Sequence, residues 1–105
     1  MKRDLFQAIA DPTRRAILVL IASQALTPNS ISQHFDTSRQ AVSKHIKILS
    51  ECDIIDNYKI GREIFYRVKP EKFKEIDKWL EQFRKLWETR FEQLDEVLSK
   101  LKKVK

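Results

Sequence analysis

The stretch Thr37–Leu49 reads T-S-R-Q-A-V-S-K-H-I-K-I-L and decides the fold. Val42, Ile46 and Leu49 recur within it at helical spacing, so one face of the expected helix is apolar and suited to burial in a small domain. We therefore expect a helix over 37–50 that packs through this face.

The start of that helix is marked by polar residues. Thr37 is the expected N-cap, and Gln40 at the third helical position would complete a capping box, in which each side chain accepts a hydrogen bond from the backbone of the other residue. A helix whose first turn is so well specified can aim the side chains of that turn at a partner.

The opposite face of the helix carries cations, an amide and hydroxyls, and no carboxylate. Arg and Gln side chains can hydrogen-bond purine edges in a major groove, and Lys neutralises phosphates. The face suits nucleic acid, although an ordinary solvated helix face is the alternative. Its residues are Ser38, Arg39, Gln40, Ser43, Lys44 and Lys47.

Short helices are expected before this stretch. Asp4 is a plausible cap for a helix through Ala10, and Asp11-Pro12 and Thr27-Pro28 each combine an N-cap residue with a proline at the first helical position. The predicted second and third helices span 12–23 and 28–35. Two short helices in succession, the second presenting a basic face, outline a helix-turn-helix.

After Leu49 the helix is expected to end near Cys52-Asp53, with Asp as a left-handed terminator where Gly is more usual. Alternating residues over 57–68 then predict a β-hairpin around Gly61-Arg62. Gly61 is the only glycine of the chain and fits the first position of a type II′ turn. This hairpin would form a wing, with Lys59 and Arg62 placed to touch the DNA backbone or minor groove.

Residues 71–101 form one long helical pattern, with an apolar stripe on more than one side. A domain of this size cannot cover such a helix, so a second copy of the chain around a two-fold axis is the expected partner. The aromatic residues Trp79, Phe83 and Trp87 could instead line an effector pocket. The expected interface on this helix comprises Trp79, Phe83, Trp87, Phe91 and Leu94.

Length and composition restrict the class of protein. The chain has 105 residues and a net charge of +6, which predicts one domain over 1–105 with an anionic partner. No apolar run is long enough to cross a bilayer and no secretory signal is evident, so we expect a cytoplasmic protein. No nucleophile has a partnered base and the chain lacks a glycine-rich phosphate loop, so an enzyme is not expected.

Three strings of the sequence resemble the ArsR/SmtB transcriptional regulators: D-P-T-R-R-A-I-L at Asp11–Leu18, S-R-Q-A-V-S-K-H-I-K-I-L at Ser38–Leu49 and G-R-E-I-F-Y at Gly61–Tyr66. The resemblance implies a mostly α fold with one β-hairpin, a winged helix-turn-helix with a long C-terminal dimerisation helix. It implies a homodimeric repressor that binds a near-palindromic DNA operator and pairs through its first helix, with Leu5 and Phe6, and its last. The matching DNA-contact positions are Ser38, Arg39, Gln40, Ser43, His45 and Arg62.

The sequence departs from the metal sensors of that family. It has one cysteine and no C-x-C pattern, and its last helix has no histidine, whereas such ions need thiolates or clustered imidazoles. The chain therefore resembles the non-metal-sensing branch, with no metal and no cofactor expected. Whether a small-molecule effector exists is left open.

Several alternatives remain at the level of sequence. His45 neighbours Val42 and Leu49, so a packed histidine competes with one that touches phosphate. Cys52 is expected to be a buried small side chain, with a redox switch as the alternative. The alternative to a DNA-binding repressor is a protein-interaction module, an anti-repressor or dimerisation partner, that works through the C-terminal helix.

Overall fold

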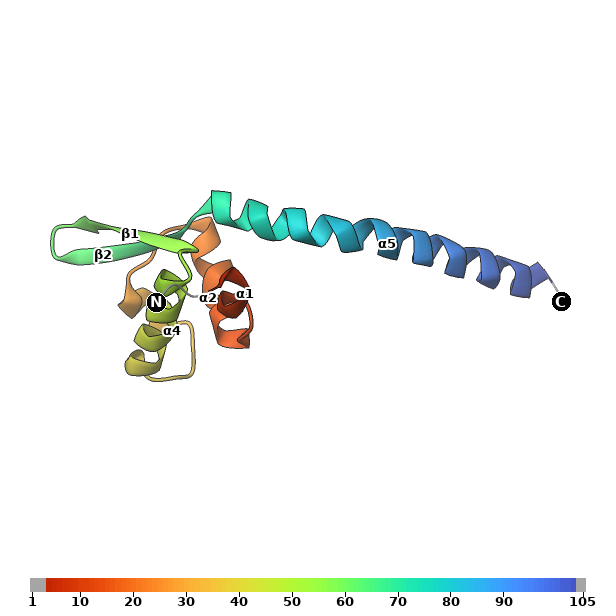
Figure 1. Ribbon diagram of the computed structural model, residues 1–105. Coiled ribbons are helices and arrows are strands. Elements are labelled where there is room, and N and C mark those ends of the chain that lie inside the picture. The colour runs from red at the N-terminus through yellow and green to blue at the C-terminus, as the bar shows by residue number, and fades with distance from the viewer. Residues whose placement is uncertain (1–3, 104–105) are drawn as a thin grey trace. The chain divides into compact units, whose positions relative to one another are not determined.

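The computed structural model describes residues 4–103. The first three residues, which are part of the stretch where no secretory signal was evident, lie outside this range. Figure 1 shows helices followed by one hairpin and a final continuous helix. The elements are α1 (Leu5–Ala8), α2 (Pro12–Ser23), α3 (Pro28–Ser32), α4 (Arg39–Glu51), β1 (Ile55–Ile60), β2 (Glu63–Val68) and α5 (Pro70–Lys103). The expected fold class, mostly α with one hairpin and a long last helix, is confirmed.

The contacts of the chain form two compact units, which divide inside α5 between Phe73 and Lys74. The first unit contains the apolar core, to which α2, α3, α4 and the start of β1 contribute. The second unit is a stretch of one helix. The expectation of a single domain over 1–105 stays a prediction, because a lone helix has no core of its own. The buried apolar residues of the first unit are Ala8, Ile17, Leu18, Ile21, Ile31, Val42, Ile46, Leu49, Cys52, Ile54 and Ile55.

The caps expected for the first three helices are present. The carboxylates of Asp4 and Asp11 accept hydrogen bonds from the first turns of α1 and α2, and the Thr27 hydroxyl accepts one from the Ser30 N–H. Two of these helices are shorter than expected: α1 ends at Ala8 rather than Ala10, and α3 ends at Ser32 rather than at residue 35. Caps are local features, whereas the ends of these helices depend on how the chain packs.

The cap assigned to Thr37 is wrong. Ser38 is the N-cap of α4, and its hydroxyl accepts a hydrogen bond from the Ala41 N–H at 3.1 Å. Because the cap lies one residue later, the third helical position is occupied by Ala41, which has no side-chain acceptor. The capping box with Gln40 therefore does not form, and α4 spans Arg39–Glu51 instead of 37–50.

The end of α4 has the geometry expected from Asp53. This residue has φ of 60°, its N–H donates to Ser50 O at 3.0 Å, and the Ile54 N–H donates to Leu49 O at 3.4 Å. These two bonds define a Schellman motif, which satisfies the last carbonyls of the helix. The chain then turns directly into β1.

The hairpin pairs β1 with β2 in antiparallel register, from Ile55 opposite Val68 to Ile60 opposite Glu63. It begins two residues before the expected boundary at 57. Gly61 has φ of 64°, and among residues 4–103 the one non-glycine residue with positive φ is Asp53. In the two-residue loop, Gly61 therefore has positive φ and Arg62 does not. This combination corresponds to the expected type II′ turn, whereas a type I′ turn needs positive φ at both loop residues.

One contact of the hairpin was not expected. Leu26 pairs with Tyr66 as an isolated antiparallel bridge, with Leu26 N–H to Tyr66 O at 3.0 Å and Tyr66 N–H to Leu26 O at 2.8 Å. This bridge fastens β2 to the segment just before α3. The helix-turn-helix and the wing are thereby joined through the backbone.

The apolar stripe of α5 is exposed in the single chain. Its large side chains from Trp79 to Leu101 have between 41% and 63% of their surface accessible. An apolar face of this length on one helix indicates a surface that meets another molecule. None of the helices in residues 4–103 combines the length and apolar character that crossing a bilayer needs.

Candidate nucleic-acid interface

The helix α4 is held by one face and presents the other. Val42 and Leu49 are fully buried and Ile46 is 4% exposed, so the packing fixes the rotation of the helix about its axis. The residues on the opposite face of the helix, among them Ser43, Lys44 and Lys47, remain exposed. This is the arrangement expected from the sequence.

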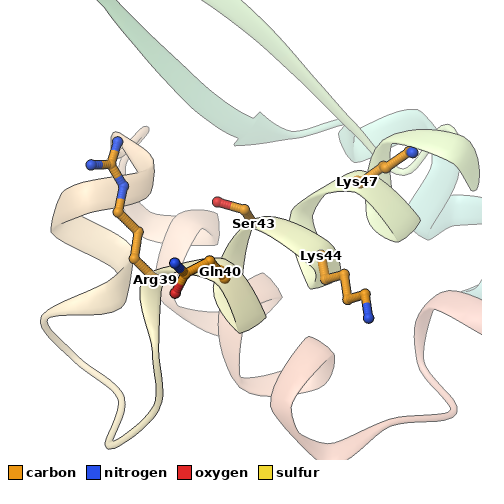
Figure 2. A pocket seen from close by; sticks show the side chains of 5 residues that line it. All are labelled: Arg39, Gln40, Ser43, Lys44 and Lys47. Atoms are coloured by element: carbon orange, nitrogen blue, oxygen red, sulfur yellow. The ribbon is translucent and has the colours of Figure 1, made fainter.

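Five residues on the outward face line a surface hollow of about 420 Å³, here called the α4 hollow. Figure 2 shows the side chains of Arg39 and Lys44 extending from the helix in opposite directions, with Ser43 between Gln40 and Lys47. The polar face therefore offers an amide and a hydroxyl in its middle and cations at its margins. The lining residues are Arg39, Gln40, Ser43, Lys44 and Lys47.

A second hollow, of about 240 Å³, lies beside the wing turn and is here called the wing hollow. Arg39 lines both hollows, and Arg62 reaches the wing hollow from the hairpin turn. Residues before and at the start of α3 complete its wall. The full lining is Thr27, Pro28, Asn29, Arg39, Arg62, Glu63 and Ile64.

The arginines and lysines of the described first unit fall into two groups. The side chains of the first group form hydrogen bonds or ion pairs with carbonyls or carboxylates of the chain. They are Arg14, Arg15, Arg67, Lys69 and Lys72. The other group makes no hydrogen bond or ion pair through its side chains within residues 4–103, and it contains Arg39, Lys44, Lys47, Lys59 and Arg62. The second group coincides with the cations expected from the sequence to meet DNA.

The wing shows the same division within one hairpin. The Arg67 guanidinium binds Asp56 at 2.8 Å and lies 5.0 Å from the centre of the Tyr58 ring. The hydrogen bond that Arg67 donates to the Asp56 carboxylate raises the pKa of Arg67 above its ordinary value. Arg67 thus interacts with other residues of the hairpin, whereas the side chains of Lys59 and Arg62 are exposed to solvent.

Two of the expected DNA-contact residues have roles within the fold. The Ser38 hydroxyl is engaged as the N-cap of α4. His45 is half-buried, and its Nδ1 lies 3.8 Å from Asp11 Oδ2 without a hydrogen-bond partner. The structure thus places His45 toward α2 and outside the residues that line the α4 hollow.

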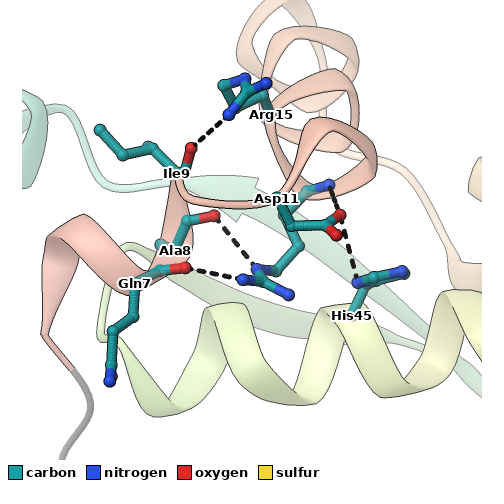
Figure 3. A network of polar contacts seen from close by, with 7 residues as sticks. Gln7, Ala8, Ile9, Asp11, Arg15 and His45 are labelled. Carbon is teal, nitrogen blue, oxygen red and sulfur yellow. Dashed lines mark hydrogen bonds and ion pairs between the residues drawn. The ribbon is translucent and has the colours of Figure 1, made fainter.

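Asp11 is the centre of a polar network at the start of α2. Figure 3 shows its carboxylate between the α2 backbone and the imidazole of His45. The hydrogen bond from the Arg14 N–H holds the pKa of Asp11 below its ordinary value. Arg14 in turn donates to Ala8 O at 3.2 Å and Gln7 O at 2.8 Å.

These contacts connect α1, α2 and α4 through polar side chains. The Arg14 and Arg15 guanidiniums donate to the carbonyls of Ala8 and Ile9 at the end of α1, where the last carbonyls of a helix lack intrahelical partners. The caps were predictable from the sequence, but the contact between Asp11 and His45 was not, because the two residues are far apart in the chain and only the packing of α4 on α2 brings them together. Within residues 4–103, no group of three His, Cys, Asp or Glu side chains could hold a metal ion.

A short helix pair with an exposed cationic second helix, followed by a hairpin with a cationic turn, defines a winged helix-turn-helix DNA-binding protein. Residues 9–57 match the family model described as "Helix-turn-helix domain". The chain is 32% identical over 80 residues to the Bacillus subtilis protein named "Transcriptional repressor SdpR", covering 76% of this chain and 89% of that protein. It is also 30% identical to an uncharacterized HTH-type transcriptional regulator, MJ1325, of Methanocaldococcus jannaschii, covering 75% of this chain and 90% of that protein.

Solved structures lead to the same family. An ArsR-like transcriptional regulator from Rhodococcus sp. RHA1 superposes with a TM-score of 0.71 at 28% identity, covering 90% of this chain and 87% of the other. The ArsR family transcriptional regulator RHA00566 gives a TM-score of 0.69 at 35% identity, covering 79% and 91%. The chain belongs to the ArsR family of winged helix-turn-helix regulators. It is a DNA-binding transcriptional regulator, a class distinct from enzymes, as the sequence predicted.

Proposed function

We propose that the chain acts as a homodimeric repressor that occupies a near-palindromic operator. The observation that carries this proposal is the division of the cations: those on α4 together with Lys59 and Arg62 of the wing are unpartnered in the described first unit, whereas the others are held by the chain. Unpartnered cations gathered on one surface attract phosphates and gain from releasing their counterions.

Within this surface the residues would divide their work by position. Gln40 and Ser43 occupy the middle of the outward face of α4 and would read base edges in the major groove. Lys44, Lys47, Lys59 and Arg62 would neutralise backbone phosphates. Ser38 would act chiefly by fixing the start of α4, and His45 chiefly by packing on Asp11.

The second copy would pair with the first through apolar residues that one chain leaves exposed. On α5 these are the aromatic and aliphatic side chains of the stripe, of which Trp87 is 50% exposed. Two α4 helices could then enter successive major grooves about 34 to 36 Å apart. The proposed interface comprises Leu5 and Phe6 of α1 with Trp79, Phe83, Trp87, Phe91 and Leu94 of α5.

Repression would follow from occlusion, because a dimer on the operator blocks access of polymerase to the same DNA. The name of the Bacillus subtilis relative, a transcriptional repressor, supports this direction of regulation. The sequence has one cysteine and two histidines, too few for a cluster of thiolate or imidazole ligands, which supports a protein of the non-metal-sensing branch.

The test is binding of genomic fragments by the purified protein at physiological salt, followed by footprinting of the best fragment. Salt must be fixed, because so basic a chain binds any DNA at low ionic strength. A two-fold-symmetric footprint that random DNA competes poorly supports the proposal, and binding no stronger than to random duplex contradicts it. The variant Lys44→Ala should weaken this binding. Its matched control is Lys78→Ala, which also removes one exposed lysine but lies on α5 outside the surface.

A further inference from the structure

The wing hollow brings together two arginines from different elements. Arg39 is the first residue of α4 and Arg62 lies in the turn of the hairpin, yet both line this one hollow of about 240 Å³. Neither guanidinium makes a hydrogen bond or ion pair within residues 4–103. Two like charges that share a hollow repel one another until an anion enters between them.

The other walls of the hollow restrict what can enter. Glu63 is its one acidic residue, so the two arginines leave an excess of positive charge. The Thr27 hydroxyl is already bonded to Ser30, whereas the amide of Asn29 has no side-chain partner in the described chain. Guanidinium groups with a neutral amide donor suit a phosphate, whose oxygens accept several hydrogen bonds at once.

We propose that the wing hollow seats one backbone phosphate of the bound DNA, held jointly by Arg39 and Arg62. This inference rests on the proposed DNA-binding surface and departs from the expectation, drawn from the sequence, that the Arg39 side chain can hydrogen-bond purine edges. Arg39 becomes a backbone contact that fixes the wing relative to α4, and base reading stays with Gln40 and Ser43, which line the α4 hollow but not the wing hollow.

The ligand is a DNA phosphate rather than a free anion because the site is continuous with the recognition surface. Arg39 lines both hollows, so a phosphate seated between the arginines would belong to the same backbone that flanks the groove occupied by α4. The α4 helix and the wing would then both contact the same segment of the DNA backbone.

The experiment is a double-mutant cycle of Arg39→Ala and Arg62→Ala, measured on the footprinted operator and on random duplex. Each single change is expected to weaken binding about tenfold on both DNAs, as expected for a charged hydrogen bond. The double variant is expected to lose about 20- to 30-fold rather than about 100-fold, because both arginines hold one phosphate. The slope of log affinity against log salt should change by about one for the double variant, rather than about two.

Replacing one operator phosphate at a time by a neutral methylphosphonate identifies the phosphate that binds in the wing hollow. One position per half-site should weaken the wild-type protein and leave the double variant unaffected. The matched cycle pairs Arg62→Ala with Lys47→Ala, which lies in the α4 hollow and not in the wing hollow, and should be additive.

The outcomes separate this inference from the proposed function. Additive losses for Arg39 and Arg62, or a loss confined to the operator for Arg39→Ala, would overturn the shared phosphate while leaving a DNA-binding repressor. Failure of the wild-type protein to prefer any fragment would remove the proposed function itself. Competition by free inorganic phosphate at millimolar concentration, without any methylphosphonate-sensitive position, would show a free-anion site and also overturn the inference.

Discussion

The Nζ atom of Lys69, which follows the wing, donates to Asp53 Oδ1 at 2.5 Å, and Asp53 terminates the recognition helix α4. Lys72 lies 3.5 Å from the other carboxylate oxygen of Asp53. The residue that ends α4 is thus tied to the segment where the wing passes into α5. This explains how the chain uses Asp at a left-handed position that Gly occupies with less strain.

We expect Asp53→Asn to lower the free energy of unfolding at pH 7. Asparagine tolerates the left-handed conformation, so the change removes the charge that holds Lys69 and Lys72 and leaves the backbone conformation accessible. The loss should shrink at high salt, which screens exposed ion pairs. Urea unfolding at two salt concentrations measures it, with Asp36→Asn, an exposed carboxylate without an ion pair in the described chain, as the control.

The same pair predicts a pH dependence. The hydrogen bond from Lys69 lowers the pKa of Asp53, so its contribution to stability is present above the unfolded pKa of about 3.9 and is lost as pH falls through the lower folded pKa. The bond to Asp53 raises the pKa of Lys69, so that contribution is lost only as pH rises through a folded pKa above about 10.4. The stability difference between wild type and Asp53→Asn should therefore be flat from about pH 5 to 9 and shrink in acid; a maximum at pH 3 would contradict it.

Gly61→Ala should destabilise the wing by about 1 kcal/mol, because its φ of 64° places an alanine in a conformation that disfavours a Cβ. No heavy atom lies within 4 Å of an added Cβ, so the cost comes from the backbone and not from a clash. Gly61→Asn, which tolerates positive φ better, is the matched control. Thermal unfolding that ranks wild type, Asn and Ala in this order supports the reading, and equal melting temperatures would contradict it.

The features that could be predicted from the sequence are those that depend on residues close together in the chain. The positive φ at Gly61, the termination at Asp53 and the caps at Asp4, Asp11 and Thr27 depend on a residue and its immediate neighbours, and all were predicted. The cap of α4 was misplaced by one residue, because Thr37 and Ser38 are both good caps and their order of preference depends on the turn that leads into the helix.

Contacts between distant segments were not predictable in this way. The bridge from Leu26 to Tyr66 joins a loop to a strand, and no periodicity marks it. The cationic face of α4 was predicted, since its apolar face fixes its rotation. The sharing of one hollow by Arg39 and Arg62 was not, because it depends on where the hairpin places its turn.

Gln40→Ala should reduce discrimination between operator and random DNA by about 1 to 3 kcal/mol if the amide makes a bidentate contact with a purine. Lys44→Ala should instead weaken binding to both DNAs and flatten the salt dependence by about one unit of slope. Titrations of each variant on both duplexes at several salt concentrations distinguish the two. Equal losses on both duplexes from both variants would contradict the assignment of base reading to Gln40.

Leu94→Glu should convert the proposed dimer to a monomer. Leu94 is 52% exposed in the single chain, and pairing of two α5 stripes would bury it, so a carboxylate there loses apolar burial and must be desolvated. We expect the dimer dissociation constant to rise at least about 100-fold, with operator affinity falling in parallel because a monomer holds one half-site. Glutamate favours helices, so α5 itself should persist by circular dichroism. Ser99→Glu adds the same charge outside the stripe and should leave sedimentation unchanged, whereas a Leu94→Glu protein that still sediments as a dimer would place the interface elsewhere.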